Sequence, residues 1–120
     1  GATAHIMNTS VDTGKIIDVK RFPINENETV ETLSNKTYKV LSVMLEEFVQ
    51  FIIENDSLPD SKECWKRKPY KRIDLEDLAT IKPDMTIKEI DKRIRATYYP
   101  GKPAPFININ GNKFEYNPKR

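Results

Sequence analysis

The hydrophobic pattern is clearest between Thr29 and Glu54. Apolar residues recur there at spacings of three and four residues, which is typical of an amphipathic helix. These residues are Val30, Leu33, Val40, Leu41, Met44, Leu45, Phe48, Val49 and Ile52. Thr29 suits the N-cap, because its hydroxyl can accept a hydrogen bond from a free backbone N–H of the first turn. The pattern predicts one long helix from Thr29 to about Glu54.

Two β elements are expected on either side of this helix. Residues 15–22 mix β-branched and polar side chains and stop at Pro23, which is typical of a strand. Near the end of the chain, Asn110-Gly111 separates two segments with alternating apolar residues. Asn-Gly readily adopts the positive φ angles of a tight turn, so these segments predict a β-hairpin.

The region between the long helix and the hairpin is less regular. Residues 56–84 contain three prolines and no clean periodicity, so they predict an extended linker with one helical turn near Asp74–Leu78. A possible capping box, Thr86 with Glu89, then precedes an apolar stripe that predicts a second helix ending near Thr97.

These elements predict an α/β fold of the α+β type. Its parts are a leading strand, a long amphipathic helix, a proline-broken linker, a short helix and a C-terminal β-hairpin. The expected domain organisation divides the chain into a vector-derived remnant at 1–7, a strand-and-helix part at 8–55, the linker at 56–84 and a C-terminal subdomain at 85–120. Residues 1–7 are therefore expected to lie outside the fold.

Composition narrows the classes of protein. The 120 residues are 38% hydrophobic and 32% charged, which suits one small soluble domain and is too polar for a membrane protein. The net charge of +2 gives no strong overall attraction to nucleic acid. Cys64 is the single cysteine, which excludes an internal disulfide framework and fits a cytoplasmic location. The single histidine, His5, lies in the excluded segment, so the rest of the chain offers no imidazole for acid–base chemistry.

Several ordered motifs resemble one enzyme family. Val11–Ile17, with Asp-Thr-Gly at its centre, is followed by Pro23-Ile24 and the helix start at Thr29–Leu33. Farther on come Ile90–Ala96, which ends in Ile-Arg-Ala, and the turn Pro100-Gly101. Taken together, this order resembles the end of the catalytic domain and the C-terminal region of folate-dependent formyltransferases. That family includes methionyl-tRNA formyltransferases and sugar-nucleotide N-formyltransferases.

The resemblance implies a role for Asp12. This residue matches the family's catalytic aspartate, which helps to move protons while an amine attacks the formyl carbon of 10-formyltetrahydrofolate. The family's asparagine and histidine lie upstream of this motif, so the resemblance implies a C-terminal part that is inactive by itself and binds no folate. The alternative interpretation is that Asp12 is only a turn residue, since Asp-Thr-Gly also suits a tight loop.

The length of the C-terminal region bears on which amine accepts the formyl group. Methionyl-tRNA formyltransferases carry a substantial C-terminal barrel, whereas only residues 98–120 follow the second helix here. The short ending favours an amine on a nucleotide-linked sugar, with methionyl-tRNA as the alternative. A further alternative is a non-enzymatic interaction module, and a homodimer is the expected assembly because a chain this short leaves apolar surface exposed. No metal site and no membrane partner are expected.

One cluster combines basic and aromatic residues. Its basic members are Lys66, Arg67, Lys68, Lys71 and Arg72, with Trp65 and Tyr70 between them. Such a cluster can contact phosphates of a nucleotide or of RNA, so Lys68, Lys71 and Arg72 are the candidate substrate-binding residues. A solvated linker is the alternative. Arg93 and Arg95 flank Ile94, so they cannot both lie on its buried stripe, and one of them is expected to form a structural ion pair with a Glu or Asp from the body of the protein.

Overall fold

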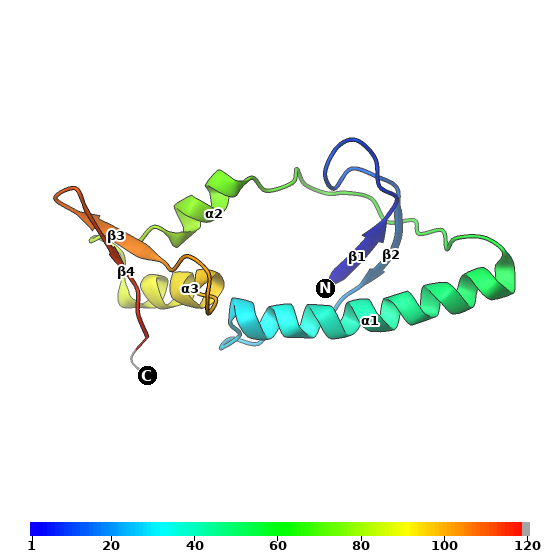
Figure 1. Cartoon of the computed structure of the whole chain (residues 1–120), viewed down its shortest axis with the longest axis horizontal. Helices are drawn as coiled ribbons and strands as arrows, with labels where there is room; N and C mark the ends of the chain where they lie inside the picture. The colour runs from blue at the N-terminus through cyan, green and yellow to red at the C-terminus, as the bar shows by residue number, and fades with distance from the viewer. Residues whose placement is uncertain (119–120) are drawn as a thin grey trace. The chain divides into compact units, whose positions relative to one another are not determined.

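The computed structural model of the chain describes residues 1–118 and confirms the α+β class (Figure 1). Its elements, in order, are β1 (Ala2–His5), β2 (Ile16–Lys20), α1 (Val30–Asn55), α2 (Arg72–Ala79), α3 (Ile87–Thr97), β3 (Phe106–Ile109) and β4 (Asn112–Glu115). The chain divides into two compact units. The first unit contains residues 1–24 and 34–69, and the second contains residues 25–33 and the chain from Tyr70 onward. No described helix is long and apolar enough to cross a membrane.

The first unit begins with a strand that the sequence analysis left out. β1 pairs antiparallel with β2, with Ala2 opposite Lys20 and Ala4 opposite Asp18. The register then shifts, so that His5 lies opposite Ile16. Ala2 and Ile16 are both buried. The prediction that residues 1–7 lie outside the fold is therefore wrong for β1. Strand β2, which was expected to lead the fold, pairs with β1.

Helix α1 confirms the long helix predicted from Thr29. The Thr29 hydroxyl accepts a hydrogen bond from the Thr32 N–H at 3.2 Å, which is the expected N-cap. Met44 is the buried residue of the helix, and Lys20 of β2 forms an ion pair with Glu47. The Glu47 partner raises the pKa of Lys20 above its ordinary value. Most of the other apolar side chains of α1 remain exposed.

In the second unit, the two arginines of α3 bind backbone as well as carboxylates. Arg93 pairs with Glu89, and its Nη1 donates to the carbonyls of Asp77 and Leu78 at 3.0 Å. Arg95 pairs with Asp91, and its Nη1 donates to the carbonyl of Glu26 at 2.7 Å. Arg93 thus adds a charged donor to carbonyls at the end of α2, where the Asp77 carbonyl also accepts from the Thr80 N–H at 3.3 Å. A structural ion pair was expected for one arginine with a carboxylate from the body, but both arginines pair with carboxylates of α3 itself.

We expect Arg93→Met to lower the free energy of unfolding by about 1–3 kcal/mol, because the carbonyls at the end of α2 lose a charged donor. Methionine keeps most of the apolar stem, so the change isolates the guanidinium. Chemical denaturation measures the difference. Lys92→Met, at an exposed neighbouring position, is the control. Equal losses in the two variants would contradict the capping role of Arg93.

The predicted hairpin is also confirmed. β3 pairs antiparallel with β4 within the chain, and Asn110 and Gly111 take φ angles of 49° and 80°. Two positive φ angles in a two-residue loop suit the right-handed twist of the flanking strands. The hairpin is joined to the chain after α2 by a hydrogen bond of 2.7 Å from the Ile81 N–H to the Phe106 carbonyl.

Candidate functional site

The Asp-Thr-Gly turn lies in the first unit, in the connection between β1 and β2. Asp12 has a φ of 51°, a left-handed conformation that aspartate adopts more readily than most residues. The Asn8 carboxamide oxygen accepts from the Ser10 N–H at 3.0 Å and lies 2.8 Å from the Thr13 hydroxyl. Local side-chain hydrogen bonds therefore fix the turn, and the Asp12 carboxylate is left half exposed.

Gly14 allows the two sides of this connection to approach closely. A Cβ added at Gly14 would lie 1.6 Å from the carbonyl oxygen of Ile6. The Ile6 N–H donates to the Lys15 carbonyl at 2.8 Å, which continues the pairing beyond β1. Only glycine fits here, because any side chain would overlap the backbone of Ile6.

Trp65 holds the other side of the turn. Its indole Nε1 donates to the Gly14 carbonyl at 2.7 Å, although 51 positions separate the two residues. The segment that carries Trp65 is tied to the end of β2 by a hydrogen bond of 2.8 Å from Arg21 to Glu63. This bond lowers the pKa of the Glu63 carboxyl below its ordinary value. Its contribution to stability is therefore present at neutral pH and is lost as the pH falls through the folded-state pKa of Glu63.

His5 belongs to the site, although the sequence analysis excluded it. Its Nε2 lies 3.7 Å from Asp12 Oδ1, and its ring meets Trp65 edge to face with centroids 5.2 Å apart. The prediction that residues 1–7 lie outside the fold is therefore wrong for His5, which is the single histidine of the chain. A signal was present in the sequence, because Thr3 and His5 alternate with two alanines at the period of a strand.

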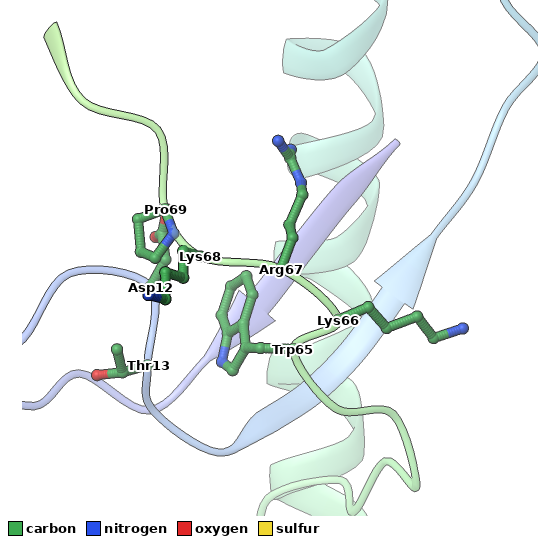
Figure 2. A pocket seen from close by; sticks show the side chains of 7 residues that line it. All are labelled: Asp12, Thr13, Trp65, Lys66, Arg67, Lys68 and Pro69. Carbon is green, nitrogen blue, oxygen red and sulfur yellow. The ribbon is translucent and has the colours of Figure 1, made fainter. Parts of the chain in front are cut away.

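An open depression of about 490 Å³ lies beside the turn. Its lining consists of Asp12, Thr13, Trp65, Lys66, Arg67, Lys68 and Pro69. Figure 2 shows the Trp65 ring turned toward the Asp12–Thr13 turn, while the Lys66 and Arg67 side chains extend away from it. The depression thus combines the Asp12 carboxylate with Lys68, a pair of opposite charges that suits a ligand carrying both an amine and a phosphate.

The candidate substrate-binding residues fall in different parts of the chain. Lys68 lines the depression with Asp12. Lys71 and Arg72 belong to the other unit, where Arg72 begins α2 and the Lys71 N–H donates to the Asp74 carboxylate at 2.7 Å. Of the three, only Lys68 shares the depression with Asp12. Within residues 1–118, no group of three or more His, Cys, Asp or Glu side chains could hold a metal ion.

Comparisons with known proteins point to formyltransferases. No family model matches the chain. A methionyl-tRNA formyltransferase from Sulfurimonas denitrificans is 38% identical over 72 residues, which cover 55% of this chain and 23% of that protein. A GDP-perosamine N-formyltransferase from Brucella melitensis is 26% identical over 114 residues, which cover 95% of this chain and 43% of that protein. The chain therefore spans less than half the length of these relatives.

Two solved structures share the fold. A sugar N-formyltransferase from a Shewanella species matches with a TM-score of 0.76 and 20% identity, over 95% of this chain and 47% of that one. A 4-N formyltransferase from Francisella tularensis matches with a TM-score of 0.71 and 24% identity, over 97% of this chain and 49% of that one. Sequence and fold together confirm the predicted resemblance of this chain to the formyltransferases.

Proposed function

We propose that this chain supplies the C-terminal part of an enzyme that transfers a formyl group to the amine of a nucleotide-linked sugar. The observation that carries the proposal is the extent of the similarity. The match to the Brucella melitensis GDP-perosamine N-formyltransferase runs along 95% of the chain. The Asp12 turn, which carries the motif of the resemblance, borders an open depression that Lys68 also lines.

The chemistry assigned to Asp12 follows from its place in the depression. In the proposed reaction the amine nitrogen attacks the formyl carbon of 10-formyltetrahydrofolate, a tetrahedral intermediate forms, and the bond from carbon to N10 of the folate breaks. The amine must lose a proton and N10 must gain one. A half-exposed carboxylate at the edge of the depression can accept the first proton directly or through another base. The oxyanion also needs donors, which the resemblance assigns to an upstream asparagine and histidine.

The acceptor is tested by direct assay of the complete gene product. It is incubated with 10-formyltetrahydrofolate and, separately, with an amino-sugar nucleotide or methionyl-tRNA, and formylated product is measured by mass spectrometry. Transfer to the amino sugar alone is the expected result. Transfer to methionyl-tRNA alone would instead indicate the acceptor of the methionyl-tRNA formyltransferase that is 38% identical over 72 residues. Absence of any transfer would overturn the proposal. The 120-residue chain assayed by itself is expected to give no product.

A second proposal concerns association, and it rests on one face of α1. Exposed apolar side chains follow this face, most of them at spacings of three and four residues. They are Tyr38, Leu41, Leu45, Val49, Ile52 and Ile53, here called the α1 stripe. A regular stripe on a straight helix is complementary to a second copy of itself related by a two-fold axis. We infer that two copies of this chain pair through the α1 stripe.

Leu45→Glu is expected to make the chain monomeric in sedimentation velocity across a concentration series, because it places a charge at the centre of the α1 stripe. Leu45 is 64% exposed, so the change costs the isolated fold little. Val43→Glu is the matched control, since Val43 is also exposed and lies about 200° around the same helix. A wild-type chain that stays monomeric, or two variants that behave alike, would contradict pairing through this face.

A further inference from the structure

We propose that His5 is a positioning residue for Asp12, whose carboxylate it holds in place for proton transfer. The proposal rests on the proposed function, because it gives His5 a task in the reaction assigned to Asp12. It extends the Asp-Thr-Gly motif to a residue seven positions upstream, at the end of the strand β1.

One hydrogen bond of the His5 ring defines its tautomer. His5 Nδ1 lies 3.0 Å from the carbonyl oxygen of Ile6. A carbonyl only accepts, so Nδ1 must carry a proton. Nε2 then faces Asp12 Oδ1 at 3.7 Å, which is an ion-pair distance rather than a hydrogen bond. The imidazole and the carboxylate therefore form an ion pair when Nε2 also carries a proton, and this contact is the one that places the Asp12 carboxylate.

Burial separates the roles of the two residues. The His5 side chain is 22% exposed and the Asp12 side chain is 50% exposed. The His5 ring meets the Trp65 ring edge to face. Asp12 lines the depression (Figure 2), and His5 is not among its lining residues. A substrate in the depression would therefore meet Asp12, and His5 would act only through Asp12.

The backbone is shaped to place the imidazole. The pairing of β1 with β2 shifts register between Ala4 and His5, and such irregularities re-aim a side chain. The acceptor of Nδ1, the Ile6 carbonyl, lies against Gly14 in the space that a Cβ would fill. A Cβ at Gly14 would also lie 3.3 Å from His5 Nδ1 itself. The glycine of the motif and the histidine therefore depend on the same close approach.

The first test is spectroscopic and does not require activity. His5 is the single histidine of this chain, so its ring ¹⁵N signals are assigned without ambiguity. The neutral ring is expected to carry its proton on Nδ1, and Asp12→Asn is expected to shift the Nε2 signal. A neutral ring protonated on Nε2 would overturn the proposal. So would an Nε2 chemical shift that does not change in Asp12→Asn.

The second test compares two variants in the complete gene product. Asparagine at position 5 keeps an amide near the Nδ1 position, whereas glutamine reaches the Nε2 position that faces Asp12. We expect His5→Asn to lower kcat on the order of 100-fold with little change in KM, and His5→Gln to recover about tenfold of that loss. Equal losses, or a loss confined to KM, would overturn the positioning role.

These two tests separate the failure of His5 from the failure of the proposed function. If the wild-type protein transfers no formyl group, the proposed function is overturned. The positioning role of His5 in that reaction is then overturned as well, whatever the ring spectra show. If the wild-type protein is active and the His5 variants match it, only the positioning role is overturned. Should His5→Asn fail to fold, the ring spectra of the wild-type chain and of Asp12→Asn still decide whether the contact exists.

Discussion

Asp12→Asn is expected to lower kcat of the complete gene product by a factor of about 10²–10⁴, the usual range for loss of a general base. Asparagine has nearly the same shape and also tolerates the left-handed backbone that Asp12 adopts at φ 51°. The turn should therefore persist, and only the negative charge and the proton acceptor are lost. Steady-state kinetics with the amino-sugar nucleotide measure the effect, with KM expected to change far less than kcat.

The chain offers a closely matched control in Asp56→Asn. Asp56 has a φ of 49°, follows the last residue of α1 and belongs to the same unit as Asp12. The same chemical change in the same backbone conformation is expected to leave kcat unchanged. Should Asp12→Asn keep full activity, Asp12 would be a turn residue only, which is the alternative that the sequence left open.

Gly14→Ala is expected to produce the largest loss of stability, above about 3 kcal/mol in the free energy of unfolding. The added Cβ would lie 1.6 Å from the Ile6 carbonyl oxygen and 2.7 Å from its carbon. These are backbone atoms, so no rotamer change relieves the overlap, and the β1–β2 connection must open. Thermal and chemical denaturation, with near-UV circular dichroism of Trp65, measure the effect.

Gly101→Ala separates steric overlap from backbone strain. Gly101 has a φ of 76°, and a Cβ there would meet nothing within 4 Å. This variant carries strain without a clash, and we expect a loss of about 1 kcal/mol. If Gly14→Ala were no worse than Gly101→Ala, the close approach of Ile6 to Gly14 would not be the constraint described above.

The sequence predicted those elements whose signals are local. Thr29 marks the start of α1, and Asn110-Gly111 marks the β3–β4 turn, because a cap and a tight turn depend on a few adjacent residues. The helical turn expected near Asp74–Leu78 lies within α2, which extends from Arg72 to Ala79. The class of fold followed from the order of these elements.

The site could be predicted only in part. Asp12 was found through the resemblance, but His5 and Trp65 reach it through contacts that no local pattern reports. β1 is four residues long and gains its structure from pairing with β2, so the alternation of Thr3 and His5 with alanines is too short to predict a strand without its partner. Trp65 was assigned to a basic cluster, whereas its indole N–H binds the Gly14 carbonyl across 51 positions of sequence. The role of Lys68, Lys71 and Arg72 in substrate binding stays a prediction.

The hydrogen bonds of Arg95 have a consequence for the order of folding. They join α3 to the carbonyls of Glu26 and Glu28, across sequence separations of 69 and 67. Closing loops of this length costs conformational entropy before the contacts between their ends can stabilise the fold. Contacts between residues far apart in sequence therefore slow folding. During synthesis, these bonds form only after α3 has left the ribosome, whereas β1 and β2 can pair much earlier. The unit that contains residues 25–33 can therefore complete its fold only after the last third of the chain has been synthesised.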